Sequence, residues 1–289
     1  MKPYFQRVAL IGVGLIGGSL ARALKKHQLC GVISGHARKV EELEKALELG
    51  VIDEYASSIT DTVKGADLVI IAVPMSAFPV VFADMASSIN DDTIITDVGS
   101  AKASVIEAAK TAFGELPKGL IPGHPIAGTE KSGVEASFDS LFENKRVILT
   151  PTDNSSKEAL TQVFQMWQAV GSEVVTMTAE HHDQVLAATS HLPHVLAFSL
   201  VETLGKMHEH SEIFRYAAGG FRDFTRIASS DPTMWRDICL HNREAILSVL
   251  KRYESHLKTL ELAIDAGDDA AITEIFMRAK KARDENVID

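Results

Sequence analysis

The chain has 289 residues, enough for one large domain or two of ordinary size. Hydrophobic residues make up 46% and charged residues 24% of it, as in ordinary folded enzymes. The net charge of -10 argues against a nucleic-acid partner, because a polyanion needs a basic face. Two cysteines are too few for a disulfide framework, and no apolar stretch reaches the roughly 18 residues of a membrane helix. We expect a cytoplasmic protein with no nucleic-acid partner and no membrane partner.

Strands and helices are predicted to alternate through the first half of the chain. Short apolar runs bounded by breakers indicate buried strands at residues 7–11, 31–34, 66–74, 93–98, 120–125, 146–150 and 173–177. Helical patterns lie between them, at residues 17–27, 40–49, 77–89, 101–113 and 156–170. This alternation predicts an α/β fold with a Rossmann-type, doubly wound, mostly parallel sheet.

Long helical patterns then replace the alternation. Helices are expected over residues 179–207, 232–266 and 270–284. Pro193 is expected to bend the first helix, and Asp231 and Pro232 suit the N-cap and first position of the second. We therefore expect a dinucleotide-binding domain at 1–178 and a helical substrate-binding and dimerisation domain at 179–289.

The first strand runs into a glycine-rich turn that is typical of dinucleotide-binding proteins. The stretch Gly12-Val13-Gly14-Leu15-Ile16-Gly17 fits the G-x-G-x-x-G pattern, follows a strand and opens a helix. Its glycines permit a tight turn, a close approach of the backbone to a pyrophosphate, and close packing of helix on strand. We expect the cofactor on these six residues and on Val73 and Pro74, which end a later strand. The alternative is a tight turn without a ligand.

The residues after the second strand favour NADP over NAD. An NAD site has an acidic residue about 20 residues past the glycines, to bind the ribose 2′-hydroxyl. This chain has Ser34-Gly35-His36-Ala37-Arg38-Lys39 at that place. An acid would repel a 2′-phosphate, whereas Arg38 can bind it through two hydrogen bonds. The alternative is that Arg38 and Lys39 simply begin a solvated helix.

His124 is the best candidate for acid–base chemistry. It follows a strand, lies between Gly123 and Pro125, and has an ordinary pKa near 6.5, which suits proton transfer. On spacing alone, a structural histidine is equally plausible. Ser100 could hydrogen-bond that imidazole or a substrate hydroxyl, or it could cap a helix that begins at Ala101.

Arg226 is suited to clamp a carboxylate, with pairing to Asp223 as the structural alternative. His182, His191 and His194 raise the question of a metal site, and a helix could bring His191 and His194 onto one face. Pro193 between them disturbs the helical turn that would align them, and the chain has no H-E-x-x-H pattern. We expect no metal.

The chain resembles the prephenate/arogenate (cyclohexadienyl) dehydrogenase family of tyrosine biosynthesis from end to end. The motifs that carry the resemblance lie at residues 12–19, 97–102, 123–128, 190–194, 220–228 and 230–235. The resemblance implies oxidative decarboxylation of prephenate, arogenate or both, with hydride transfer to NAD(P). It offers no indication of which of the two substrates is used.

The same resemblance implies roles for individual residues. His124 would take the proton of the ring hydroxyl, and Ser100 would help to orient both groups. Arg226 would bind a substrate carboxylate. The pocket would be lined or supported by Ser190, His194, His182 and Trp235, with Thr129 in a loop nearby. Such enzymes form homodimers through the helical half, which would place an apolar stripe in the interface: Ile246, Val249, Leu250, Tyr253 and Leu257.

Two other functions compete with this interpretation. A β-hydroxyacid dehydrogenase usually depends on a lysine in the interdomain helix, where this chain has Ser190, His191 and His194. A regulator that senses NADP without turnover would not need His124 and Arg226 together. Family members that prefer NAD usually carry an acid where this chain has Ala37, which again favours NADP.

Overall fold

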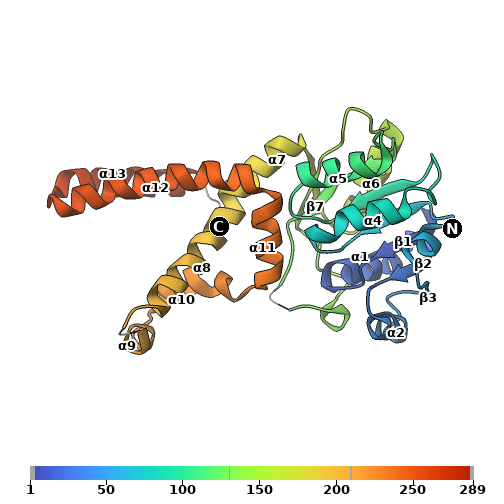
Figure 1. Cartoon of the computed structure of the whole chain (residues 1–289), viewed down its shortest axis with the longest axis horizontal. Coiled ribbons are helices and arrows are strands. Elements are labelled where there is room, and N and C mark those ends of the chain that lie inside the picture. Colours follow the sequence, from blue (N-terminus) through green and yellow to red (C-terminus); the bar gives the residue numbers. More distant parts are fainter. Residues whose placement is uncertain (1–3, 130, 209, 287–289) are drawn as a thin grey trace. The chain divides into compact units, whose positions relative to one another are not determined.

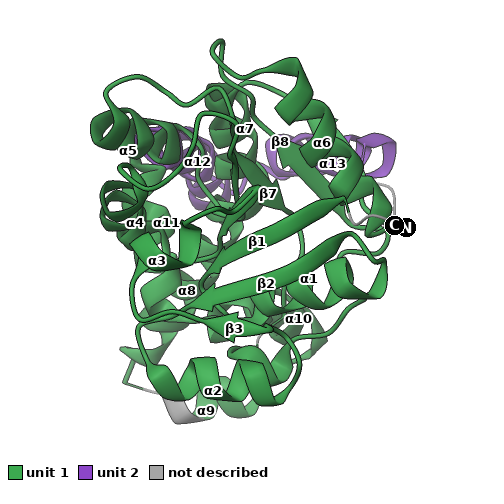
Figure 2. Cartoon of the chain, turned by 90° about the vertical axis from the view of Figure 1, so that its right-hand side faces the viewer, with its two compact units in different colours: residues 1–243 green, residues 244–289 purple. Residues whose placement is uncertain are grey.

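The computed structural model describes residues 4–129, 131–208 and 210–286, and the chain divides into two compact units, residues 1–243 and 244–289 (Figure 2). The first unit holds both sheets and the helices that follow them. The second holds the last two long helices. The domain boundary near residue 178 stays a prediction, since the compact units are divided after Arg243.

A six-stranded parallel sheet forms the centre of the first unit (Figure 1). Its strands are β1 (Phe5–Ile11), β2 (Cys30–His36), β3 (Glu54–Tyr55), β4 (Leu68–Ile71), β5 (Ile94–Asp97) and β6 (Leu120–Ile121). They lie in the order β3-β2-β1-β4-β5-β6, which confirms the predicted Rossmann-type sheet. The order reverses between β1 and β4, and open sheets of this kind bind their ligands at that point.

Both faces of the sheet are covered by helices, because alternate residues of each buried strand point to opposite sides. Val8 and Leu10 share one core with α1 (Leu15–Lys26), α2 (Val40–Glu48) and α6 (Lys157–Ala169). Ala9 and Ile11 share the other core with α3 (Ile59–Val63), α4 (Phe78–Met85) and α5 (Ala103–Phe113). The sheet is therefore doubly wound.

A second, three-stranded sheet carries the first candidate catalytic residue. It consists of β7 (Gly123–Pro125), β8 (Arg146–Leu149) and β9 (Glu173–Thr176), with β7 antiparallel to β8. The single strand predicted over 120–125 is wrong: the chain leaves the large sheet at Pro122, which has no backbone N–H, and pairs again as β7. His124 then lies opposite Ile148 in β8.

One helical stretch, residues 179–205, passes from α7 (Ala179–Leu186) through a π-helical segment (Ala187–His191) into α8 (Leu192–Gly205). Pro193 cannot bond to the carbonyl four residues earlier, and the wider π-turn before it absorbs that defect. By length and composition alone this stretch could cross a membrane, in contrast to the prediction from the sequence. Core helices of water-soluble proteins pass the same test, and this one carries buried ionisable residues of the site described below.

The remaining helices follow in short steps: α9 (His210–Arg215), α10 (Gly219–Thr225), the 3₁₀-helix η4 (Arg226–Ser229), α11 (Pro232–His241), α12 (Arg243–Asp265) and α13 (Asp269–Asn286). Asp231 caps α11 as predicted, accepting the Met234 amide at 2.9 Å. The prediction of one helix over 232–266 is wrong, because the chain breaks at Asn242, whose side chain is drawn into the site.

Candidate active site

The glycine-rich turn between β1 and α1 is shaped for a dinucleotide. Gly12 has φ +99°, and a Cβ there would lie 2.2 Å from the carbonyl oxygen of Ala72. A Cβ on Gly17 would lie 2.2 Å from the carbonyl oxygen of Gly12, so neither position accepts a larger residue. At Gly14 a Cβ would meet no atom within 4 Å, and α1 begins at the next residue. This open space at a helix N-terminus fits a pyrophosphate.

The other residues predicted to hold the cofactor surround this turn. Three hydrophobic residues pack into or against the core, so that their backbone is what a ligand can contact: Val13, Leu15 and Ile16. Val73 follows β4, and its Cγ1 lies 3.2 Å from the position of a Cβ on Gly12. Pro74 comes next, before the short 3₁₀-helix η1 (Met75–Ala77). The structure thus brings the ends of β1 and β4 together.

Arg38 is exposed beyond the end of β2. The carbonyl of His36 accepts the Gly12 amide at 2.8 Å, which fixes the end of β2 against the glycine turn. Lys39 pairs with Glu42 at 3.7 Å. Within the described parts of the chain, the structure gives Arg38 no hydrogen bond or ion pair, so its guanidinium is available to a ligand.

A hydrogen-bonded row of three side chains begins at His124 in β7. His124 Nδ1 lies 2.8 Å from Nε2 of His182, and His182 Nδ1 lies 2.8 Å from Oδ1 of Asp183. His182 and Asp183 are buried residues of α7. The Asp183 carboxylate also accepts the amides of Lys102 and Ala103, at 2.8 and 2.9 Å. The row therefore connects β7, α7 and the start of α5.

Burial governs the charge state of this row. Although His124 is only partly buried, desolvation holds its pKa well below the ordinary value near 6.5, and positive charge on His182 or Lys102 lowers it further. Desolvation also lowers the pKa of His182. Burial alone would raise the pKa of Asp183, but its hydrogen bonds from His182 and two amides outweigh that effect and lower it. At neutral pH the row is a carboxylate followed by two neutral imidazoles.

A buried ion pair fixes the backbone just before His124. Lys102 and Asp97 are almost completely buried and contact each other directly. Asp97 accepts the amide of Gly123 at 3.1 Å, while Lys102 Nζ donates to the carbonyl of Gly123 at 2.6 Å. The peptide groups on both sides of Gly123 are thereby held in place. Because each charge has its partner, the pair can lie in the protein interior.

Ser100 lies in the loop between β5 and α5, but it does not cap that helix. The helix begins at Ala103, and Asp183 accepts the amides at its start. The predicted cap at Ser100 is therefore wrong, because a carboxylate from α7 takes its place. Ser100 is partly buried and has no hydrogen bond to any residue in the described ranges; its role toward a substrate hydroxyl stays a prediction.

Aromatic side chains form a second group on the helices. The imidazole of His194 stacks on the indole of Trp235, with ring centroids 3.7 Å apart and an interplanar angle of 19°. His191 meets the same indole edge-on, at 6.1 Å. His194 Nδ1 donates to the carbonyl of Ser190 at 2.8 Å. The buried Nε1 of Trp235 has no hydrogen-bond partner among the residues described, and such a donor is suited to a ligand.

The last two predicted site residues differ in their surroundings. Arg226 begins η4, and its charge acts on His194, whose pKa is lowered first by burial and also by this cation. Thr129 lies on the exposed loop after β7, where its hydroxyl accepts the amide of Lys131 at 3.2 Å. Among the described residues, Arg226 therefore acts on the group around His194, whereas no contact links Thr129 to that group.

Sequence reasoning gave no role to Lys102, Asp183 or Asn242. The Asn242 amide donates to the carbonyl of Asp183 at 2.8 Å and lies 3.1 Å from Nδ1 of His191. Burial lowers the pKa of His191 to about 4, so this imidazole is neutral. Nothing in the sequence distinguished Asp183, because it lies within a run of five polar residues, 180–184, at the start of the helical pattern.

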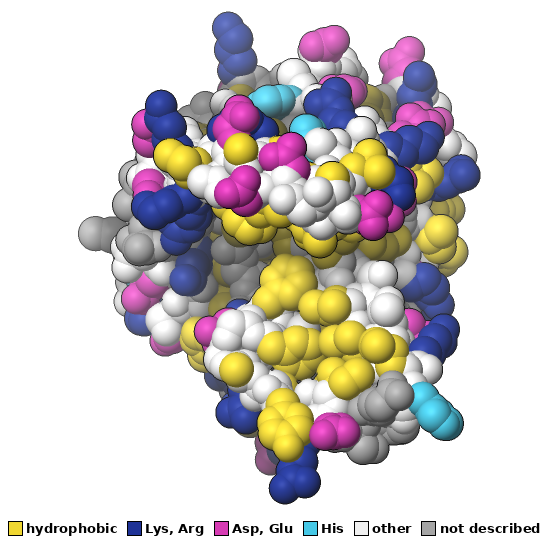
Figure 3. All heavy atoms as spheres, turned by 90° about the vertical axis from the view of Figure 1, so that its left-hand side faces the viewer, with side chains coloured by type: hydrophobic (Ala, Val, Ile, Leu, Met, Phe, Trp, Pro, Cys, Tyr) yellow, Lys and Arg dark blue, Asp and Glu magenta, His cyan; other side chains and the backbone are white. Residues whose placement is uncertain are grey.

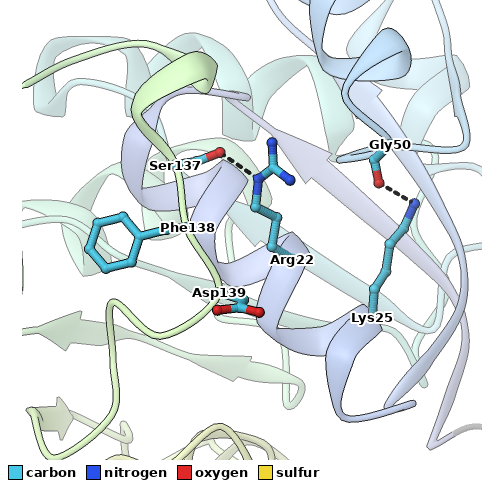
Figure 4. Close-up of a pocket in the computed structure, with 6 residues that line it drawn as sticks. All are labelled: Arg22, Lys25, Gly50, Ser137, Phe138 and Asp139. Carbon is cyan, nitrogen blue, oxygen red and sulfur yellow. Dashed lines mark hydrogen bonds between the residues drawn. The ribbon is translucent and has the colours of Figure 1, made fainter.

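A separate hollow on the far end of α1 contains none of the predicted site residues (Figure 4). It has a volume of about 400 Å³ and is lined by Arg22, Lys25, Gly50, Ser137, Phe138 and Asp139. Its basic groups are already engaged: Arg22 Nε donates to Ser137 Oγ at 2.9 Å, and Lys25 Nζ donates to the carbonyl of Gly50 at 3.0 Å. The residues predicted to carry the chemistry lie in the group around His124 instead.

Comparison with known proteins gives matches along nearly the whole chain. Residues 20–176 match the nucleotide-binding domain of prephenate dehydrogenase, and residues 178–278 match its dimerization domain. A cyclohexadienyl dehydrogenase of Zymomonas mobilis is 43% identical, over 96% of this chain and 95% of that protein. A prephenate dehydrogenase of Bacillus subtilis is 40% identical, over 96% of this chain and 75% of that protein.

Solved structures agree with these sequence matches. Prephenate dehydrogenase from Aquifex aeolicus, in complex with hydroxyphenyl propionate and NAD+, superimposes with a TM-score of 0.89 at 40% identity, covering 97% of this chain and 98% of that one. Arogenate dehydrogenase from Synechocystis gives a TM-score of 0.83 at 26% identity, covering 98% of this chain and 100% of that one. These likenesses extend over both the sheet and the helical part.

Proposed function

The chain belongs to the prephenate dehydrogenase family, and we propose that it acts on prephenate, arogenate or both with His124 as the base. Family membership makes it an oxidoreductase that carries out oxidative decarboxylation with NAD(P). The observation that carries the assignment of His124 is the row from Asp183 through His182 to His124. His182 engages Nδ1 of His124, which leaves Nε2 to take a proton.

The residues of the glycine turn would hold the diphosphate of the cofactor, as the open space at Gly14 allows. A bound NAD(P) would supply the acceptor for the hydride that leaves C4 of the substrate ring, and the ring carboxylate would leave as carbon dioxide while its bonding electron pair completes the aromatic ring. His124 Nε2 takes the C4 hydroxyl proton and later returns a proton to the phenolate oxygen of the product. Arg226 would bind a substrate carboxylate, and Trp235 Nε1 would donate to a second polar group.

This function is tested by following reduced cofactor and carbon dioxide together. Purified protein with prephenate or arogenate should form both products in equal amounts, because one substrate loses one hydride and one carboxylate. Reduced cofactor without carbon dioxide, obtained instead with a β-hydroxyacid, would support the competing dehydrogenase. Binding of NADP without turnover of any of these substrates would support the sensing protein. The ratio of kcat/KM for prephenate and arogenate would also decide which substrate is preferred.

For the cofactor, we propose a preference for NADP over NAD. Arg38 is exposed and has no hydrogen bond or ion pair among the described residues, and no acid occupies the adjacent position, where Ala37 stands. Arg38→Ala should lower kcat/KM for NADP by about tenfold and change that for NAD little, because one charge-assisted contact to the 2′-phosphate is lost. Lys39→Ala, whose lysine pairs with Glu42, is the matched control. A wild-type preference for NAD, unaffected by Arg38→Ala, would contradict the proposal.

We also propose that the chain forms a homodimer through its helical part, as the family description of a dimerization domain suggests. Hydrophobic side chains gather on the face shown in Figure 3. In the second unit, the exposed large hydrophobic residues are Leu247, Tyr253, Leu257, Leu262, Ile264, Phe276 and Met277. Of the predicted stripe, Tyr253 and Leu257 are exposed whereas Ile246 is buried. A stable monomer in sedimentation velocity would contradict this proposal.

A further inference from the structure

We propose that Asp183 is a positioning residue that sets the tautomers of His182 and His124 and thereby makes Nε2 of His124 the base. The inference rests on the proposed function, in which His124 takes the proton of the ring hydroxyl. Asp183 itself lies two side chains away from the substrate, so it acts through the two imidazoles. Its place at the end of the row gives the hydrogen bonds a direction that neither histidine could set alone.

The direction of the hydrogen bonds along the row follows from which atoms can donate a proton. An ionised carboxylate only accepts, so the 2.8 Å contact from Asp183 Oδ1 requires a proton on Nδ1 of His182. A neutral imidazole carries one proton, which leaves a lone pair on Nε2 of His182. That lone pair faces Nδ1 of His124 at 2.8 Å, so Nδ1 of His124 carries the proton and its Nε2 is free to accept one.

The opposite order is disfavoured at the contact with Asp183, which accepts only. A proton on Nε2 of His182 would turn the lone pair of Nδ1 toward a carboxylate 2.8 Å away. The other charged and titratable groups around the row are engaged elsewhere. Lys102 pairs with Asp97, and Nδ1 of His191 lies 3.1 Å from the Asn242 amide. The orientation therefore originates at Asp183.

Two backbone amides at the start of α5 hold the Asp183 carboxylate in place. Its Oδ1 accepts the amide of Lys102 at 2.8 Å and its Oδ2 accepts the amide of Ala103 at 2.9 Å, at the positive end of α5. Both oxygens are thus fixed before any substrate binds. His124 lies in β7 and Asp183 in α7, and the two amides that hold Asp183 lie at the start of α5. The row that orients the base is therefore complete only when α7 packs against α5.

The carboxylate also stabilises the charge that develops during the reaction. When Nε2 of His124 takes the hydroxyl proton, the proton on Nδ1 of His124 can move to Nε2 of His182. The positive charge then lies on the imidazole next to Asp183, as in other carboxylate–imidazole pairs. The reverse transfers return a proton to the phenolate oxygen of the product, so the row ends each turnover unchanged.

The kinetic test compares Asp183→Asn with Glu180→Gln, a neutralised carboxylate on the exposed side of the same helix. Asp183→Asn should lower kcat by about 10²- to 10⁴-fold, the range for loss of general-base catalysis. KM for the substrate and the dinucleotide should stay within about threefold, because neither contacts Asp183. Glu180→Gln should leave kcat unchanged. Circular dichroism and a thermal melt verify that each variant is folded.

A spectroscopic test needs no variant of Asp183 to fold. Nitrogen-15 spectra of histidine-labelled wild-type protein distinguish protonated from unprotonated ring nitrogens, and His124→Asn and His182→Asn assign the two rings. At neutral pH, both rings should be protonated on Nδ1 and unprotonated on Nε2. A proton on Nε2 of either ring would overturn the inference.

The outcomes separate this inference from the proposed function. Wild-type turnover of prephenate or arogenate together with an unchanged kcat in folded Asp183→Asn would overturn the role of Asp183 alone. Absence of turnover in the wild-type protein would overturn the proposed function, while the nitrogen spectra would still report the tautomers. A loss of kcat at constant KM, together with the expected spectra, supports both.

Discussion

His124→Asn is expected to lower kcat by about 10²- to 10⁴-fold and to leave KM for the substrate and the dinucleotide nearly unchanged. Asparagine keeps a polar side chain in β7, but it cannot take a proton from the ring hydroxyl. The base acts in the transition state rather than in ground-state binding, so the loss should fall on kcat. Steady-state kinetics with prephenate and saturating cofactor measure it.

His181→Asn is the matched control, since His181 is an exposed residue of α7 next to His182. It should retain wild-type kcat and KM. If folded His124→Asn retained the wild-type kcat, the proton would have to be taken by another group, and the site assignment would be wrong. A rise in KM at constant kcat would instead place His124 in substrate binding.

Lys102→Met is expected to destabilise the fold by about 3–5 kcal/mol, the cost of breaking a buried ion pair on one side. Among the residues described, it leaves the buried Asp97 carboxylate with two amide hydrogen bonds, from Gly99 and Gly123. It also releases the carbonyl of Gly123, and with it the backbone that positions His124. Urea unfolding followed by circular dichroism measures the change in the free energy of unfolding.

The exposed Lys110 on the same helix provides the control, and Lys110→Met should change the free energy of unfolding by about 1 kcal/mol or less. The double variant Asp97→Asn with Lys102→Met should be more stable than the sum of the two single changes predicts, because no unpaired charge remains. Additive effects of the two substitutions, or wild-type stability of Lys102→Met, would show that the pair does not hold this part of the fold.

The Rossmann-type sheet was predictable because its signals are local. Continuous apolar runs marked β1 and β4, and glycines with defined backbone requirements marked the turn after β1. The separation of β6 from β7 was not predictable in this way. Whether residues 123–125 extend one sheet or join another depends on their pairing with β8, more than twenty residues later.

In the site, too, the features that depend on contacts between distant segments could not be predicted from the sequence. His124 and Arg226 could be singled out from the sequence itself, and the resemblance to a family added the residues around His194. Asp183 was missed because its function depends on contacts with α5, which a helical pattern in the sequence does not reveal. The break at Asn242 was missed for a similar reason: the propensity of the segment is helical, and a tertiary hydrogen bond to Asp183 competes with it.

The pH dependence of kcat/KM tests most directly whether a neutral, oriented His124 is the base. The unprotonated imidazole is the active form, and burial holds the pKa of His124 well below 6.5. As pH falls through 6.5, kcat/KM should therefore remain on its plateau and decline only at lower pH, provided that the substrate's own titration is subtracted. A decline centred near 6.5 or above, and absent from His124→Asn, would show an ordinary, solvated base and would contradict this account of the site.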